Sequence, residues 1–176
     1  GFDKTVDITT GPVIDARAWT RLKGLVDDAV SEGATLLAGG DRPAGLNAGH
    51  YLAPTVLTDV TETMAVYREE TFGPIVSIVP FDTKTDLLRM ANDCEEGGLT
   101  AYIFTRNLAR AEHYAARLRY GEIQINGVKY DIDLPHGGIG QSGIGHDCSA
   151  LALHDYLVQK RITRALDTTT FGGLNP

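Results

Sequence analysis

The stretch Arg68-Glu69-Glu70-Thr71-Phe72-Gly73-Pro74 decides the fold, because it joins two acids and an aromatic ring to a turn that leads into an apolar run. Residues 75–81 read Ile-Val-Ser-Ile-Val-Pro-Phe, and this β-branched composition predicts a buried strand. Gly73-Pro74 fixes where that strand begins, since proline ends whatever regular structure precedes it. The two acids must therefore face solvent or a ligand, because an unpaired carboxylate is too costly to bury.

The residues alone leave two interpretations of this stretch open. A carboxylate can accept hydrogen bonds from two neighbouring hydroxyls, which suits a ribose, and Phe72 can offer a flat apolar face to a ring. Alternatively, the acids are solvated side chains at a helix end and Phe72 belongs to the core. Without further information, the residue types favour the second interpretation.

Downstream of this stretch the hydrophobic period switches repeatedly between that of a strand and that of a helix. We expect helices at residues 83–92 and 108–119, and strands at residues 75–81, 100–105 and 122–126. Strands and helices that alternate across short loops predict right-handed crossovers and a parallel sheet. This half of the chain is predicted to be α/β.

The flanking segments have weaker patterns. Upstream, an amphipathic helix is expected at residues 15–32, starting at Asp15 and stopping at Gly33. Strands are expected at residues 35–38 and 51–57, with Pro54 placing the second at a sheet edge or a bend. Downstream, a long loop at 127–145 precedes a short helix at 149–156, a final strand at 159–166 and a loose polar tail.

Composition excludes several classes of protein. The chain has 176 residues, a net charge of -7 and 43% hydrophobic residues, which describe an ordinary acidic globular domain. A nucleic-acid partner or a membrane surface would favour basic patches, and no apolar run is long enough to cross a bilayer. Two cysteines make no disulfide framework, so we expect a cytoplasmic protein.

Three further patterns could mark sites, and each has a simpler interpretation. Gly138, Gly140 and Gly143 form a GxGxxG pattern, but it does not directly follow a strand, so a glycine-rich turn packed on a neighbouring segment is preferred to a phosphate cradle. Cys148 stands near a predicted helix start with His146 close by, yet no oxyanion donors accompany it, and a small buried residue is the preferred interpretation. The histidines around it match no zinc spacing, so we predict neither a catalytic residue nor a metal site.

Taken together, the ordered motifs resemble the C-terminal part of the aldehyde dehydrogenase superfamily over nearly the whole chain. The landmarks are Gly39-Gly40, Pro54-Thr55-Val56-Leu57, Glu69-Glu70-Thr71-Phe72-Gly73-Pro74, Ala91-Asn92, Gly98-Leu99-Thr100-Ala101, Ile125-Asn126, Pro135-His136-Gly137-Gly138 and Ser142-Gly143-Ile144-Gly145. The resemblance implies NAD- or NADP-dependent oxidation of an aldehyde to a carboxylic acid through a cysteine thiohemiacetal, hydride transfer and thioester hydrolysis. The implied fold is the parallel-sheet α/β catalytic domain, incomplete at its N-terminus.

The resemblance also assigns residues. Glu70 would bind the nicotinamide ribose and Phe72 would pack near the nicotinamide, both projecting from the carboxyl-edge region of the parallel strands. The loop at 126–138 would line the aldehyde entrance, with Tyr130 and His136 as wall residues. The family more often has Phe where His136 stands, so a polar substrate or an aminoaldehyde is conceivable, as in aminobutyraldehyde-type or lactaldehyde-type branches.

The resemblance further divides the chain and limits its activity. Residues 1–147 would form the partial catalytic domain, and residues 148–176 a segment that crosses to a partner subunit in a homo-dimer or tetramer, followed by the loose tail. The family's nucleophilic cysteine and dinucleotide-binding domain precede the position of Gly1, and neither Cys94 nor Cys148 falls at the nucleophile's place. The isolated chain is thus expected to be inactive. The alternative is a silent domain retained for oligomerisation or ligand binding.

Overall fold

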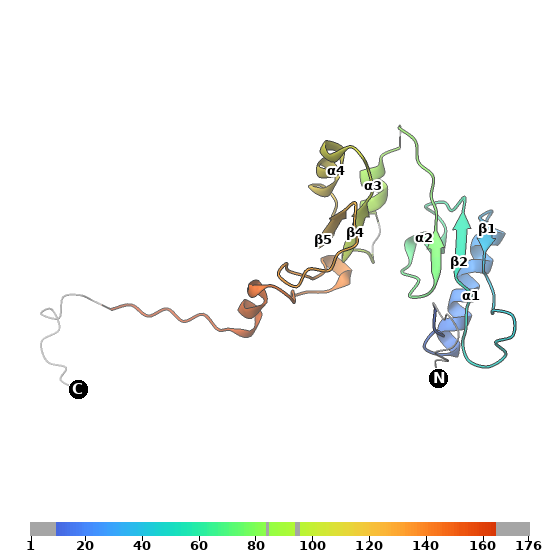
Figure 1. Cartoon of the computed structure of the whole chain (residues 1–176), viewed down its shortest axis with the longest axis horizontal. Coiled ribbons are helices and arrows are strands. Elements are labelled where there is room, and N and C mark those ends of the chain that lie inside the picture. The colour runs from blue at the N-terminus through green and yellow to red at the C-terminus, as the bar shows by residue number, and fades with distance from the viewer. Residues whose placement is uncertain (1–9, 84, 94–95, 165–176) are drawn as a thin grey trace, which may run out of the picture.

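A computed structural model describes residues 10–83, 85–93 and 96–164, and within them it shows two small sheets (Figure 1). The first sheet has the order β1 (Thr35–Ala38), β2 (Thr55–Thr58), β3 (Ile75–Ser77), and in the second β4 (Thr100–Ile103) pairs with β5 (Glu122–Ile125). The pairs β2–β3 and β4–β5 are parallel, and β1 is antiparallel to β2. The predicted α/β class with parallel strand pairs is confirmed.

Helix α1 (Ala16–Ser31) forms as its sequence predicts. Asp15 caps its start by accepting a hydrogen bond from the Ala18 N–H at 2.8 Å, and Gly33 follows its end with a φ of 110°. Its apolar stripe is buried, including Leu22 and Val26. The amphipathic pattern therefore identified both the helix and the face that it packs inward.

Of the two positions predicted from Pro54, the sheet edge is wrong, because β2 is the central strand of its sheet. The strand begins one residue after the proline, at Thr55, whose N–H donates to the Pro74 carbonyl at 2.8 Å. Pro54 thus needs no N–H in the ladder, and the constraint that excludes proline from central strands does not apply to it.

The predicted three-strand parallel sheet is only partly formed. β3 is shorter than predicted, and among the described residues it has no hydrogen-bonded pairing with β4, so the crossover through α3 (Leu87–Asn92) joins two separate sheets. The helix α2 (Ala65–Arg68) is a single turn that ends directly before Glu69 and Glu70, so the alternative interpretation was right that these acids follow a helix end. The helix α4 (Leu108–Ala115) is shorter than its prediction.

The segment after β5 differs most from its prediction. The short helix predicted at 149–156 forms as the 3-10 helix η2 (Ala150–Tyr156), and the loop before it contains a further 3-10 turn, η1 (Gly140–Ser142), that was not predicted. The predicted strand at 159–166 is wrong within the described residues, since residues 159–164 have no assigned strand or partner. The last two residues of that predicted strand, the tail that follows it and Cys94 lie outside the described residues. The division of the chain at residue 147 stays a prediction.

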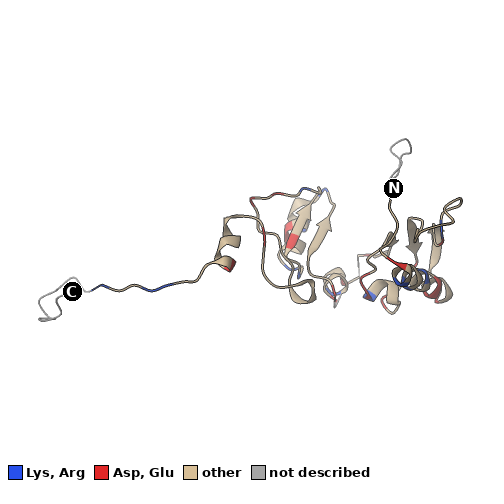
Figure 2. Cartoon of the chain, turned by 90° about the horizontal axis from the view of Figure 1, so that it is seen from below, with Lys and Arg blue, Asp and Glu red and all other residues tan. Residues whose placement is uncertain are grey.

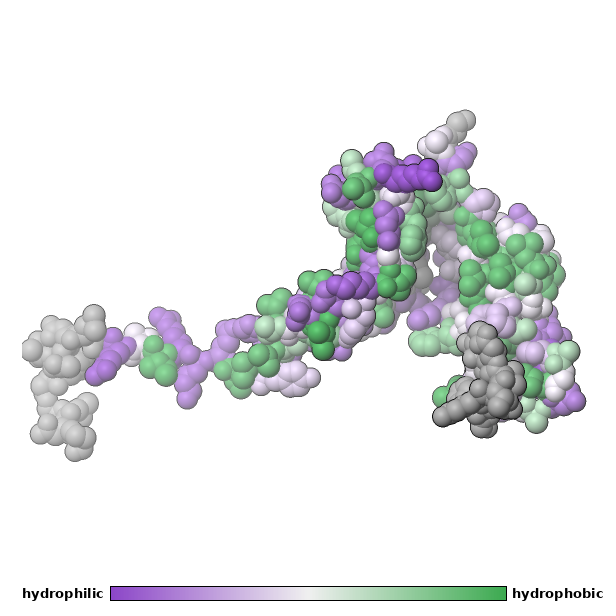
Figure 3. Space-filling model, viewed as in Figure 1, coloured by the Kyte–Doolittle hydropathy of each residue, from purple (hydrophilic) through white to green (hydrophobic). Residues whose placement is uncertain are grey.

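The buried core lies between α1 and the first sheet, and it gathers Val26, Ala29, Ala34, Leu57, Val60, Met64 and Val66. The second sheet has little of its own core, and large apolar side chains such as Phe104 and Tyr102 are exposed there. Figure 3 shows apolar residues at the surface over both halves of the chain. Such exposure is typical of surfaces that another part of a protein covers.

Side-chain contacts tie α3 to the first half of the chain. The Arg89 guanidinium donates two hydrogen bonds to the Glu62 carboxylate, at 2.8 and 2.9 Å, and the Tyr67 hydroxyl donates to the Met90 carbonyl at 3.0 Å. Bidentate pairs of this kind are the strongest ionic contacts between side chains. They hold α3 against α2 and the residues that precede it.

The distribution of charged residues and the absence of a long apolar helix in the described chain match what the composition predicts. Figure 2 shows basic and acidic residues scattered along the described chain, with no large basic patch in view. None of the helices in the described part of the chain combines the length and the apolar character that a membrane crossing requires.

We predict that the core around Leu57 determines the stability of the first half. Leu57 is 0% exposed, so Leu57→Ala should lower the free energy of unfolding by about 2–5 kcal/mol. Urea denaturation followed by circular dichroism measures this change. Leu37→Ala is the matched control, because Leu37 is 59% exposed in the neighbouring strand and its loss should change stability by less than about 0.5 kcal/mol. Equal effects of the two substitutions would contradict this location of the core.

Candidate functional site

The Glu70–Phe72 turn joins α2 to β3 and is packed against α1. A methyl group added at Gly73 would lie 2.7 Å from Leu22 Cδ2, so only glycine lets the turn approach the buried Leu22 side chain this closely. Because the turn precedes β3, it lies at the amino end of the parallel strands β2 and β3. The prediction that Glu70 and Phe72 project from the carboxyl edge is therefore wrong.

Two side chains from distant parts of the sequence hold the backbone of this turn. The Arg21 guanidinium donates to the carbonyls of Glu70 and Thr71, and the Glu70 N–H donates to Glu96 Oε2 at 2.6 Å. Arg21 is on α1 and Glu96 is in the segment before β4. The turn is thus fixed from both sides through its main chain, which leaves its side chains available.

Glu70 and Phe72 are both presented to solvent at the mouth of a cavity. The cavity has a volume of about 710 Å³ and is lined by Arg21, Glu69, Glu70, Phe72, Glu96 and Gln141. Phe72 is 77% exposed, which excludes its assignment to the core. Within the described residues no hydrogen bond or ion pair occupies the Glu70 carboxylate, although its main chain is bonded on both sides.

Phe72 has a backbone conformation that aromatic residues rarely adopt. Its φ is 45°, in the left-handed region. Such strain costs on the order of 1–3 kcal/mol, persists only where surrounding contacts enforce it, and is concentrated at ligand-binding sites. Here the enforcing contacts are the Arg21 hydrogen bonds to the two preceding carbonyls.

Tyr130 and His136 are brought together by the loop that follows β5. Their rings meet edge to face with centroids 5.6 Å apart, and both line a cavity of about 490 Å³ between β5 and the loop. His136 Nδ1 is 3.2 Å from Glu122 Oε2, and main-chain bonds between His136 and Asp147 close the loop. The two residues therefore share one wall of this cavity, and their place at an aldehyde entrance stays a prediction.

The hydroxyl of Tyr130 contacts the thiol of Cys148. Its oxygen lies 2.7 Å from Cys148 Sγ, and this hydrogen bond raises the pKa of Tyr130 to about 12. Cys148 thus orients the Tyr130 side chain in this structure. This contact pairs the Tyr130 hydroxyl with the Cys148 thiol itself, so it does not provide the oxyanion donors that a nucleophilic Cys148 would need.

The glycine-rich segment packs on its neighbours, which confirms the preferred interpretation of the GxGxxG pattern. The Ile139 N–H donates to the Gly98 carbonyl at 3.0 Å, and a methyl group at Gly121 would lie 2.9 Å from the Gly137 carbonyl carbon. Gly121 permits this close approach of backbone to backbone, whereas Gly140 and Gly143 of the pattern have open space where a side chain would begin. Among the residues that the structure describes, no three His, Cys, Asp or Glu side chains gather as metal ligands.

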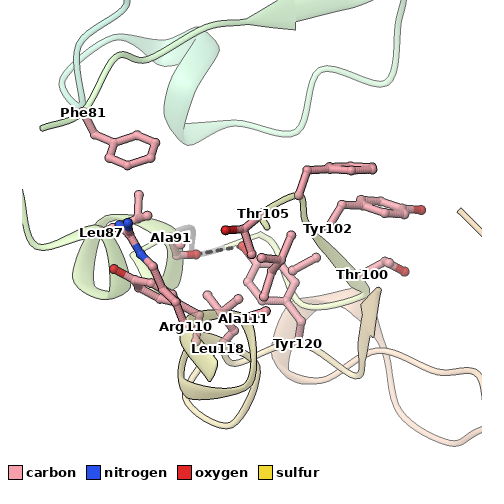
Figure 4. Close-up of a pocket in the computed structure, with 14 residues that line it drawn as sticks. Phe81, Leu87, Ala91, Thr100, Tyr102, Thr105, Arg110, Ala111, Leu118 and Tyr120 are labelled. Atoms are coloured by element: carbon pink, nitrogen blue, oxygen red, sulfur yellow. Dashed lines mark hydrogen bonds between the residues drawn. The ribbon is translucent and has the colours of Figure 1, made fainter. Parts of the chain in front are cut away.

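A third cavity, of about 470 Å³, lies between β4, α3 and α4 and is mainly apolar (Figure 4). Phe81, Leu87 and Tyr102 line it, and Tyr120 closes one side by donating to the Ala91 carbonyl at 2.8 Å. Arg110 is its one charged lining residue within the described chain. It offers packing surface and no paired acid and base.

Sequence reasoning missed Arg21, Glu96 and Glu122. Each forms a hydrogen bond to a residue that is distant in the sequence. The separation is 49 and 50 positions for the two partners of Arg21, 26 positions for the partner of Glu96 and 14 positions for the partner of Glu122. No local pattern marks such partners, because charged residues on helices and loops are ordinarily solvated. The acids of the motif were visible only because they adjoin the Gly-Pro turn.

Comparison with known proteins gives consistent matches. Residues 1–162 match the family described as "Aldehyde dehydrogenase family". Aminoaldehyde dehydrogenase 1 of Pisum sativum is 35% identical, and the match covers 94% of this chain and 33% of that protein. Glutarate-semialdehyde dehydrogenase of Pseudomonas putida is 40% identical, and the match covers 85% of this chain and 30% of that protein. The crystal structure of the Mycobacterium tuberculosis aldehyde dehydrogenase complexed with NAD+ superposes with a TM-score of 0.77 and 35% identity, covering 83% of this chain and 30% of that chain. The chain spans about a third of the length of these relatives.

We predict that the Cys148 thiol controls the titration of Tyr130. Because the pKa of about 12 lies above the ordinary value near 10, the phenol and its hydrogen bond persist below pH 10 and are lost as the pH rises through 12. Cys148→Ala should bring the Tyr130 pKa back towards 10. Carbon-13 NMR of ring-labelled tyrosine measures it, with Tyr130→Phe assigning the resonance. An unchanged titration in Cys148→Ala would show that the hydrogen bond is absent in solution.

Proposed function

Because this chain belongs to the aldehyde dehydrogenase family, we propose that it is the C-terminal part of an NAD- or NADP-dependent enzyme that oxidises an aldehyde to a carboxylic acid. The observation that carries the proposal is the turn at 69–73, held by its main chain from two sides while the Glu70 carboxylate and the Phe72 ring stay exposed at a cavity. Such a turn is built to present side chains to a ligand.

The residues present fit a nicotinamide nucleotide. The Glu70 carboxylate would accept hydrogen bonds from the ribose hydroxyls, and the exposed Phe72 ring would cover one face of the nicotinamide. A nicotinamide coenzyme supplies the hydride acceptor for aldehyde oxidation when bound. The named complex of a relative with NAD+ supports a nucleotide here and does not choose between NAD and NADP.

The loop at 126–138 would form the aldehyde side of the same site. Tyr130 and His136 share one wall of the 490 Å³ cavity, and Tyr130 is fixed by Cys148. Names of relatives include both an aminoaldehyde and a semialdehyde enzyme, so the names leave the aldehyde class open. The aldehyde class then depends on the chemistry of the residues that line this cavity.

The proposed function also includes an assembly and a compartment. A homo-dimer or tetramer is supported by the exposed apolar residues of 156–164, including Tyr156, Val158 and Ile162. The cytoplasm is supported by the two cysteines of the sequence. A silent domain for oligomerisation or ligand binding is the competing function, and it shares these two features but needs no exposed Glu70.

We predict that Glu70 contributes to coenzyme affinity in the full-length protein. Glu70→Gln keeps one acceptor oxygen but loses the charge of the hydrogen bonds, so the Kd for NAD should rise roughly tenfold. Fluorescence titration of the coenzyme measures this. Glu69→Gln is the matched control, since it makes the same change one residue away and should alter the Kd less than about twofold. An unchanged Kd in Glu70→Gln would contradict the coenzyme assignment.

We also predict that the isolated chain of 176 residues turns over no aldehyde. Residues 1–176 supply no cysteine at the family's nucleophile position, so incubation with NAD and short aldehydes should produce no NADH absorbance. The full-length enzyme is the positive control. Turnover by the isolated chain that Cys148→Ala abolishes would assign the nucleophile to Cys148 and overturn this expectation.

A further inference from the structure

The cavity between β5 and the loop at 126–136 has walls that are fixed from several directions. The Lys129 N–H donates to Gln124 Oε1 at 2.6 Å, which ties the loop to the strand. The Ser149 N–H donates to the Ile132 carbonyl at 2.8 Å, which ties it to the following segment. A recess held in this way can select a ligand by charge, because its groups do not need to reorganise to meet it.

Glu122 supplies the unbalanced charge of this cavity. Its side chain is only 23% exposed, and its carboxylate accepts hydrogen bonds from Gln124 Nε2 at 2.6 Å and from Thr100 Oγ1 at 3.3 Å. Both of these donors are neutral. The one ion-pair partner in the described chain is His136, which carries a positive charge only when protonated.

The other charged groups of the cavity cancel. Lys129 Nζ is 2.9 Å from Asp131 Oδ2. Their hydrogen bond raises the pKa of Lys129 and lowers the pKa of Asp131, so both remain charged and neutralise each other. The Lys129–Asp131 pair is neutral as a whole, so the carboxylate charge of this recess that no lysine or arginine of its lining balances is located at Glu122.

Tyr130 adds an aromatic surface to the same recess. Its side chain is 63% exposed, its hydroxyl is held by Cys148, and its ring packs edge to face with the ring of His136. An aromatic face beside a carboxylate is the combination that binds ammonium groups, through the ring quadrupole and through direct attraction.

We propose that this cavity receives the cationic end of an amino- or ammonium-substituted aldehyde, and that Glu122 is the residue that selects it. The proposal rests on the proposed function, since it names the substrate class of the same site. An aldehyde with a carboxylate at its far end would be placed beside the Glu122 charge and repelled. An aldehyde with a methyl group there would be neither attracted nor repelled.

The test uses the full-length enzyme and three aldehydes that differ in charge. The cation is β-aminopropionaldehyde, butanal replaces its ammonium group by a methyl group of similar size, and succinic semialdehyde is an anion. We expect kcat/KM to decrease in that order. Glu122→Gln should lower kcat/KM roughly tenfold with the aminoaldehyde, mainly through KM, leave butanal within about twofold and raise the value with succinic semialdehyde.

Matched variants separate selection from folding. Glu112→Gln makes the same change of charge on the exposed surface of α4 and should leave all three values unchanged. Butanal turnover reports whether Glu122→Gln is folded. If that variant does not fold, Tyr130→Leu should still weaken turnover of the aminoaldehyde selectively, and added salt should raise KM with the aminoaldehyde but not with butanal.

The outcomes distinguish this inference from the function that it refines. Equal losses with the aminoaldehyde and with butanal in Glu122→Gln, or a wild-type preference for succinic semialdehyde, would overturn the charge selection while aldehyde oxidation stands. Failure of the full-length protein to oxidise any of the three aldehydes would instead overturn the proposed function.

Discussion

The packing of α1 against the turn at 69–73 is the contact on which the rest of the structure depends. Leu22 is fully buried where the turn passes over it, and Gly73 is the residue that permits this approach. The preceding residue of α1, Arg21, donates to the carbonyls of the same turn. The helix therefore sets both the position of the turn and the direction of its backbone, and β3 begins where the turn ends.

The core and the candidate site are distributed unequally along the chain. The buried apolar residues belong mainly to α1 and the first sheet, while the second sheet contributes the loop with Tyr130 and His136. The halves are joined by polar contacts, including the Arg89–Glu62 pair and the bond from the Glu70 main chain to Glu96. A site made from both halves is thus sensitive to polar substitutions that hardly affect the core.

The two cavities next to the candidate residues have different chemical characters. The cavity at Glu70 and Phe72 has a carboxylate that no other described residue pairs with and a ring that is exposed on a strained backbone, which suits a sugar and a flat heterocycle. The cavity at Glu122 holds a carboxylate among neutral donors next to an aromatic face, which suits a cation. The ligand that each cavity suits depends on one carboxylate, Glu70 in the first and Glu122 in the second, whose charge its surroundings leave unbalanced.

The sequence by itself determined α1 with its cap, the strand cores and the Gly-Pro turn, because period, capping and turn chemistry are local properties. The candidate residues Glu70, Phe72, Tyr130 and His136 came instead from the resemblance of the ordered motifs to a known family, and their roles stay predictions. The sequence did not show that the strand β2 begins only after Pro54. The turn at 69–73 was predicted at the carboxyl end of the parallel strands and lies at their amino end. A strand was predicted at 159–166, and its described residues have no strand partner. Strand ends and pairings depend on which segments meet in space. Only the tertiary structure brought Arg21 and Glu96 to the turn and Glu122 to His136, since contacts between residues 14 to 50 positions apart leave no periodic trace in a single sequence.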